Sequence, residues 1–160
     1  MREIRVRKRA LDEAEAREIL ARAEYGILAS AGADGWPYAV PLNHVLVGDA
    51  IYLHCAFEGH KIDNIAHEER VSYCAVASAR VLPEKLSTLY ESAIVFGRAA
   101  VVVDEEEKRR ALKLLMERFC GPSAETGARF EEHLRQHETA QVIRIAIERI
   151  TGKAQRAASP

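Results

Sequence analysis

The spacing of hydrophobic and polar residues changes several times along the chain, and each spacing predicts a different element. Between Asp12 and Ala23 the apolar residues recur every three or four positions, which predicts an amphipathic helix with Asp12 as its N-cap. From Tyr25 onward the apolar residues alternate with others, a period of two that is typical of strands with one buried face. This alternation predicts strands over residues 25–31, 36–47, 50–56, 71–79, 92–103 and 140–151.

Three further helices are predicted from apolar spacing and capping residues. A short helix over residues 60–67 follows Gly59. Asp104 is the predicted N-cap of a helix that runs to about residue 119, and a last helix covers about 125–136. The helix that begins after Asp104 carries an apolar stripe that we expect to be buried, formed by Leu112, Leu115, Met116 and Phe119.

The order of these elements predicts a mainly β fold with flanking helices. Glycine-containing turns at 32–35 and 48–49 join the first three strands as hairpins. Sequential antiparallel strands, without a helix between each pair, favour a small barrel with helices outside it. The sequence argues against a dinucleotide-binding fold of the Rossmann type, because no Gly-x-Gly-x-x-Gly lies between a strand and a helix. At 160 residues the chain fits a single domain over 1–160, with a core over 10–154 and flexible termini.

Composition and charge narrow the class of protein. Lys and Arg total 23 against 24 for Asp and Glu, so a formal net charge of -1 gives no reason to bind nucleic acid or an anionic membrane. No stretch approaches the roughly 18–20 apolar residues that a membrane span needs. The basic N-terminus runs into an acidic helix and is therefore not a secretory signal. We expect a cytoplasmic protein that acts on a small molecule.

The cysteines and a histidine pair give no metal or disulfide signal. Cys55, Cys74 and Cys120 are odd in number and contain no Cys-x-x-Cys, so we expect reduced thiols rather than a disulfide framework or a zinc site. His133 and His137 are four residues apart on a predicted helix, but no third ligand accompanies them. We therefore expect a solvated polar face there and no metal site.

Polar side chains that could bind a ligand or take part in catalysis are concentrated between residues 38 and 65. Asn43, His44 and His54 lie within two apolar strands, and Lys61 lies in the first turn of the next helix. A helix N-terminus offers unpaired N–H groups and a positive dipole end, so this corner suits a phosphate group. A lysine in the first turn of a surface helix is also commonly only solvated, and the residues alone leave both interpretations open.

The two strand histidines form the candidate catalytic pair. The alternation places His44 and His54 on one face of a hairpin, where either could donate a proton to a bound substrate. The alternative for each is a structural histidine that is hydrogen-bonded within the fold. His44 is the residue to which we assign the tentative catalytic role.

Five segments, taken together and in this order, resemble one known group of proteins. They are AEYGILAS at 23–30, YAVPLNHVLVGDAIYLHCA at 38–56, GHKIDNI at 59–65, SAIVFGRAAVV at 92–102 and RIAIERITGKA at 144–154. The group is the FMN-binding split-barrel superfamily, which includes pyridoxamine 5'-phosphate oxidase, and the most similar branch contains nitroimidazole-resistance proteins. The resemblance implies a six-stranded antiparallel split β-barrel. It also implies a homodimer that holds FMN in two clefts between the subunits.

The resemblance assigns cofactor contacts to individual positions. The FMN phosphate would be held by Gly59, His60 and Lys61. The isoalloxazine ring would be lined, largely through backbone groups, by Val40, Pro41, Leu42, Asn43 and His44. The ribityl chain and the ring edge would be approached by His54, Cys55 and Ala56. Contacts from the partner subunit would come from Glu91 and Ser92.

The chain departs from the oxidase in a strand motif that carries two cations. An Arg-x-x-Leu-Lys strand motif is replaced here by Pro41-Leu42-Asn43-His44, which lacks both cations, so pyridoxamine phosphate is not the expected substrate. The resemblance instead implies an FMN-dependent oxidoreductase, similar to flavin reductases or nitroreductases, that reduces a small oxidised compound such as a nitro-aromatic. Two alternatives stay open: a non-catalytic split barrel that binds flavin or haem, and a reductase that uses the deazaflavin F420.

Overall fold

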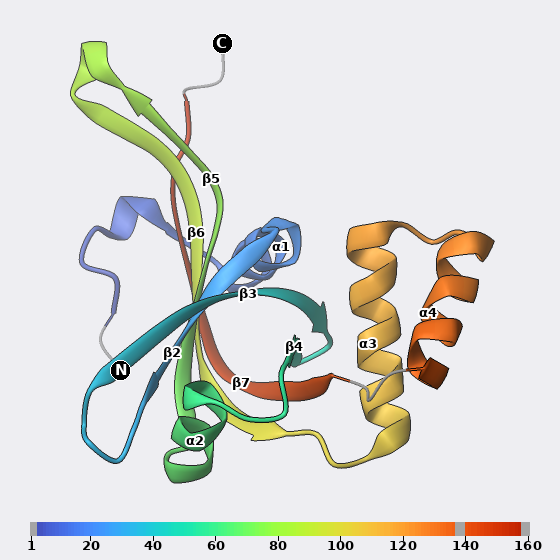
Figure 1. Ribbon diagram of the computed structural model, residues 1–160. Coiled ribbons are helices and arrows are strands. Elements are labelled where there is room, and N and C mark those ends of the chain that lie inside the picture. The colour runs from blue at the N-terminus through green and yellow to red at the C-terminus, as the bar shows by residue number, and fades with distance from the viewer. Residues whose placement is uncertain (1–2, 137–139, 158–160) are drawn as a thin grey trace.

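Six long strands wind into a closed antiparallel ring in the computed structural model, which describes residues 3–136 and 140–157 (Figure 1). The strands are β2 (Tyr25–Ala31), β3 (Pro37–Val47), β4 (Ala50–Cys55), β5 (Arg70–Leu82), β6 (Ser87–Val101) and β7 (Gln141–Gln155). Their order around the ring is β7-β4-β3-β2-β5-β6, and pairing of β6 with β7 closes it. The prediction of a six-stranded antiparallel barrel is therefore confirmed. The pair His133 and His137 lies outside the residues whose side chains are described.

Some strands differ in extent from the prediction. A two-residue strand, β1 (Ala10–Leu11), was not predicted and pairs with β7 outside the ring. Strands β5 and β6 extend past the barrel as a hairpin arm whose turn is the short helix η2 (Pro83–Lys85) (Figure 1). Both faces of this arm are largely open to solvent, so its residues lack the apolar alternation from which strands are predicted.

Four α-helices of the described chain lie around the barrel. They are α1 (Glu13–Arg22), α2 (His60–His67), α3 (Glu105–Cys120) and α4 (Ala124–Gln136), and a short helix η1 (Arg7–Arg9) precedes β1. Helices α3 and α4 form a pair at one side of the barrel, next to β4 (Figure 1). The Asp12 carboxylate accepts the N–H of Glu15 at 2.8 Å, and Asp104 accepts the N–H of Glu107 at 2.7 Å. Both predicted N-caps are therefore confirmed.

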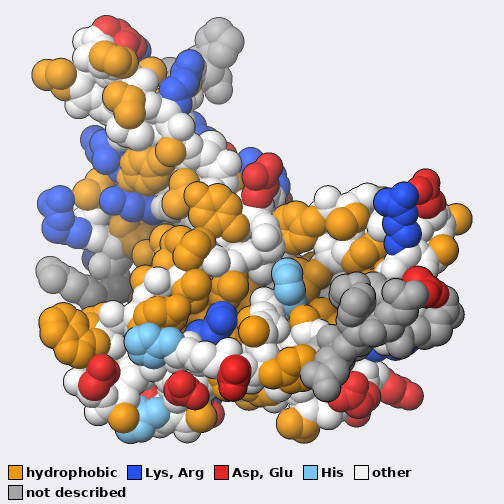
Figure 2. Space-filling model, viewed as in Figure 1, with side chains coloured by type: hydrophobic (Ala, Val, Ile, Leu, Met, Phe, Trp, Pro, Cys, Tyr) orange, Lys and Arg blue, Asp and Glu red, His pale blue; other side chains and the backbone are white. Residues whose placement is uncertain are grey.

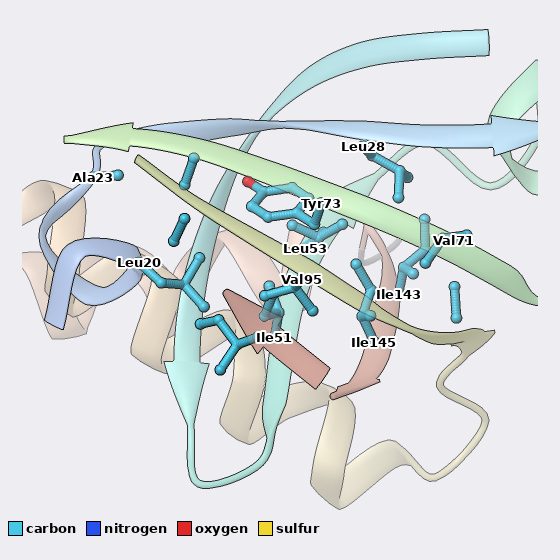
Figure 3. Close-up of a cluster of buried hydrophobic side chains, with 14 of the residues drawn as sticks. Leu20, Ala23, Leu28, Ile51, Leu53, Val71, Tyr73, Val95, Ile143 and Ile145 are labelled. Atoms are coloured by element: carbon cyan, nitrogen blue, oxygen red, sulfur yellow. The ribbon is translucent and has the colours of Figure 1, made fainter. Parts of the chain in front are cut away.

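The main hydrophobic core fills the barrel and continues under α1. Inward-facing residues of β2, β4, β5, β6 and β7 are buried there, as Figure 3 shows for Leu28, Leu53, Tyr73, Val95 and Ile143. Strand β3 adds side chains that are partly buried against this core. A second, smaller cluster lies on the outer face of the barrel, where α3 covers part of β4 and β7. This second cluster holds the helical pair against the barrel near the candidate site.

None of the helices in the described parts of the chain combines the length and the apolar character that crossing a membrane requires.

Candidate functional site

The barrel opens between β3 and β4 because β3 changes its neighbour halfway along. Residues 37–43 of β3 pair with β2, whereas residues 44–47 pair with β4. Beyond Leu53, β4 pairs only with β7, through His54 and Cys55. Within the described chain, residues 37–43 of β3 and residues 54–55 of β4 are thus not paired with each other, and we call the opening between them the β3–β4 split. Backbone groups of β3 that point into the split are available to a ligand.

A pocket of about 470 Å³ lies at the split, and we call it the strand pocket. It is lined by Tyr25, Pro41, Leu42, Asn43 and His54 from three neighbouring strands. The side-chain amide of Asn43 donates to the carbonyl oxygen of Glu24 at 2.8 Å, which fixes its orientation. The structure thus brings together four of the residues that the sequence analysis assigned to the cofactor.

A second pocket of about 270 Å³ adjoins the first, and we call it the helical pocket. Asn43 and His54 belong to both pockets. The remaining lining residues come from α3, from α4 and from the position just before β7: Leu112, Leu115, Met116, Phe119, Cys120, Phe130, Leu134 and Ala140. The apolar stripe of α3 was predicted to be buried, but only Leu115 is, and the stripe forms a wall of this pocket.

The start of α2 lies beside the N-terminal half of β3. The ring of His60 contacts the ring of Tyr38, with centroids 4.2 Å apart. Gly59 precedes the helix at a φ of 122°, a conformation that favours glycine. Lys61 is half-buried. Burial raises the pKa of the Cys55 thiol, and the positive charge of the nearby Lys61 opposes that rise. His60 and Lys61 therefore lie near one residue from each side of the split, Tyr38 of β3 and Cys55 of β4.

His44 occupies a structural position, and the prediction that it shares a face with His54 is wrong. The register of the hairpin pairs His44 with Leu53, so His44 points into the barrel while His54 points outward. The His44 ring is fully buried, with Nε2 2.8 Å from the Leu20 carbonyl oxygen and Nδ1 3.0 Å from the Tyr73 hydroxyl. Burial lowers its pKa to about 4. This geometry favours the structural alternative for His44.

Other assigned residues differ in what they can offer a ligand. Val40 packs against the barrel core and Cys55 is buried in it, so their side chains face away from the strand pocket. Ala56 is exposed just after β4. Val40 and Cys55 can therefore reach a ligand in the split only through their backbone groups.

Glu91 and Ser92 lie away from the split of their own chain. Both are on β6, which neighbours β5 and β7 rather than β3 or β4. Glu91 pairs with Arg156 at 2.8 Å and with Arg22 at 3.1 Å, and the hydrogen bond from Arg156 contributes most to lowering the pKa of Glu91. The hydroxyl of Ser92 donates to the carbonyl oxygen of Lys153 at 3.4 Å. Neither residue therefore lines the strand pocket of its own chain.

The sequence analysis missed two contributors to the site. Tyr25 is 55% exposed at the start of β2 and lines the strand pocket. The inner residues of α4 line the helical pocket through Phe130 and Leu134. Two signals were visible in the sequence: an aromatic residue at the start of a strand and the apolar spacing of the last helix. Neither of them indicates a ligand by itself.

Comparison with known proteins identifies the fold family. The family model for pyridoxamine 5'-phosphate oxidase matches residues 12–154. No curated protein sequence matches the chain. A crystal structure from Bacteroides thetaiotaomicron, of a protein named for 5-nitroimidazole antibiotic resistance, is 26% identical, with a TM-score of 0.72 over 90% of this chain and 85% of that one.

Two further structures share the fold at lower identity. A conserved hypothetical protein from Mycobacterium tuberculosis is 20% identical, with a TM-score of 0.78 over 99% of this chain and 94% of that chain. The FAD and haem binding protein from Mycobacterium smegmatis is 19% identical, with a TM-score of 0.70 over 91% and 72%. The resemblance found in the sequence is confirmed. Because the family model spans most of the chain and the ring of six strands has the fold of these proteins, the chain belongs to the pyridoxamine 5'-phosphate oxidase family.

Proposed function

We propose that this protein is a cytoplasmic FMN-dependent oxidoreductase that reduces a small oxidised compound, with a nitro-aromatic as the leading candidate. The observation that carries the proposal is the β3–β4 split, where an unpaired strand edge borders an open pocket and Lys61 lies near Cys55 at the end of β4. The strand edge offers N–H and C=O groups for the polar edge of a flavin ring. The 26% identical protein named for nitroimidazole resistance supports the choice of substrate class.

The residues at the split fit FMN in chemical character. Gly59 has no side chain to obstruct a phosphate, and Lys61 and the first N–H groups of α2 supply positive charge and donors. Pro41 and Leu42 give the strand pocket an apolar wall for a planar ring. When bound, FMN supplies the electron-transfer chemistry, and the protein supplies binding and orientation. Of the two strand histidines, the exposed His54 is the one placed to exchange a proton with a substrate.

The phosphate contact is tested by comparing FMN with riboflavin. A charge-assisted contact to the phosphate contributes about 1.5–3 kcal/mol, so Lys61→Ala should weaken FMN roughly tenfold to a hundredfold. Riboflavin lacks the phosphate and should bind the wild type and Lys61→Ala almost equally in a fluorescence titration. Lys85→Ala, in the turn of the hairpin arm, is the matched control and should leave both ligands unchanged. Equal losses for FMN and riboflavin, or no loss for FMN, would show that the assignment is wrong.

The visible spectrum of the purified protein separates the proposal from its alternatives. A flavin absorption band identified chemically as FMN supports it, whereas a Soret band would favour haem binding, as in the FAD and haem binding protein of similar fold. Bound F420 would indicate the deazaflavin alternative. Anaerobic mixing with NADH or NADPH then distinguishes an enzyme, whose flavin band is bleached, from a carrier.

We also propose that two copies associate through an apolar band on the outer face of β2, β5 and β6. Figure 2 shows apolar side chains gathered over this part of the barrel. The register aligns Ile27, Cys74 and Ile94 in one row across the three strands, and the row continues to Pro41 of the strand pocket. Ile94 is 40% exposed, and Val76 beside the row is 51% exposed. A second copy on this band would lie at the edge of the split, and its Glu91 and Ser92 could then contribute to the site.

Light scattering tests this association. We expect twice the chain mass of 17.8 kDa at micromolar concentration. Ile94→Asp places a charge in the apolar band and should yield monomers. Val103→Asp changes a residue that is 88% exposed and lies beyond the end of β6, so it should leave the dimer intact. A wild-type monomer, or a dimer that persists in Ile94→Asp, would contradict the proposed interface.

A further inference from the structure

We infer that the helical pocket binds the uncharged aromatic part of the substrate. The inference rests on the proposed function, because it takes FMN to occupy the neighbouring β3–β4 split. The helical pocket and the strand pocket share Asn43 and His54, so a molecule in the helical pocket reaches the split at its polar end. The rest of the helical pocket is walled mainly by aliphatic and aromatic side chains of α3 and α4.

The volume of the helical pocket sets the size of its ligand. An apolar cavity of about 150 Å³ binds benzene, so a pocket of about 270 Å³ accepts a compound with one or two rings. The helical pocket is larger than the site of a single buried water. The exposed His54 lines both pockets, so the helical pocket opens toward the strand pocket at this residue. A one-ring nitro compound therefore fits with its ring between the two helices and its nitro group toward the split.

The chemistry of the lining residues sets the charge of the ligand. No Lys, Arg, Asp or Glu is among the described residues that line the helical pocket. An ionised group loses its hydration on entering an apolar pocket, and here no charged partner would replace that hydration. Polar groups are confined to one end, where Asn43 and His54 can hydrogen-bond to a neutral acceptor such as a nitro oxygen. We therefore expect the pocket to select neutral aromatic compounds over anionic ones of the same shape.

Two fluorinated probes of nearly equal shape test the selection by charge. 4-Fluoronitrobenzene is neutral, whereas 4-fluorobenzoate carries a carboxylate where the first has its nitro group. Binding to the FMN-loaded protein is followed by ¹⁹F NMR, which reports occupancy without requiring turnover. The neutral probe should bind at least tenfold more tightly than the anionic one. Equal affinities, or tighter binding of 4-fluorobenzoate, would overturn the inference.

Matched substitutions on α3 test the location. Met116→Trp fills the helical pocket and should weaken 4-fluoronitrobenzene at least tenfold, whereas Lys113→Trp, on the exposed face of the same helix, should change it less than twofold. If Met116→Trp does not fold, Leu134→Trp fills the pocket from α4 instead. Unchanged probe affinity in the filled variant would overturn the inference.

The FMN affinity of the same variants separates this inference from the proposed function. Filling the pocket should leave FMN affinity within twofold of the wild type, and a large loss would overturn the inference because FMN itself would then occupy the helical pocket. A different result would refute only the proposed function: the wild type binds no FMN but still binds 4-fluoronitrobenzene, and Met116→Trp lowers the affinity for this probe.

Discussion

The buried imidazole of His44 should make the protein lose stability in mild acid. Its pKa is lowered from 6.5 to about 4, mainly by burial. The positive charge of Arg118 adds to this lowering, and the hydrogen bond with the Leu20 carbonyl oxygen opposes it. The unfolded chain therefore binds a proton between these two pH values and the folded protein does not. Stability is fully present above the unfolded pKa of 6.5 and falls as the pH drops toward 4.

The size of this effect follows from the shift in pKa. One pKa unit corresponds to about 1.4 kcal/mol, so the full shift corresponds to about 3 kcal/mol between neutral pH and pH 4. Most of the transition lies above pH 5, so lowering the pH from 8 to 5 should cost about 2 kcal/mol through this one group. His44 is fully buried, so screening by solvent does not reduce the figure.

Urea unfolding followed by circular dichroism, at fixed protein concentration and without flavin, measures this loss. The free energy of unfolding of the wild type should fall by about 2 kcal/mol more than that of His44→Gln when the pH drops from 8 to 5. His54→Gln removes an exposed histidine and should keep the pH dependence of the wild type. His44→Gln should also be less stable at pH 8, because it disturbs the contacts with Leu20 and Tyr73.

One result would refute this reasoning directly. If the wild type and His44→Gln lose the same free energy of unfolding between pH 8 and 5, His44 does not titrate as a buried neutral ring. If the wild type becomes relatively more stable in acid, the folded protein holds the imidazolium form. The protonated ring could then donate to the Leu20 carbonyl oxygen and to the Tyr73 hydroxyl, which itself lies 2.7 Å from the carbonyl oxygen of Leu42.

Two further predictions concern packing and capping. A Cβ atom on Gly97 would lie 2.2 Å from the backbone oxygen of Ala146, so Gly97→Ala should push β6 away from β7 and cost roughly 1–3 kcal/mol, measured by urea unfolding. Wild-type stability in Gly97→Ala would contradict the close approach of the two strands. Asp104→Ala removes the N-cap of α3 and should cost about 1 kcal/mol, whereas Asp104→Asn should cost less because its amide oxygen still accepts the N–H of Glu107. Equal losses in both variants would contradict the capping role.

The sequence by itself determined the elements whose signals are local. The N-caps at Asp12 and Asp104 depend on residues three positions apart, and both were predicted and found. Apolar residues alternate along most of the barrel strands, which one sequence displays directly, whereas residues 50–53 of β4 are buried on both faces because α3 covers the outer one. Five segments between residues 23 and 154 resemble the split-barrel proteins, and the family to which they point is confirmed.

Only the tertiary structure decided which residues meet. Alternation shows the two faces of one strand but not how two strands align, and a shift of one residue turns a side chain to the other face. The turn at 48–49 pairs Val47 with Ala50, so His44 lies opposite Leu53, and His54 points away from it. The change of partner along β3 and the placement of α3 and α4 depend on contacts between distant segments. These long-range contacts create the split and the helical pocket, for which the local pattern of residues has no signal.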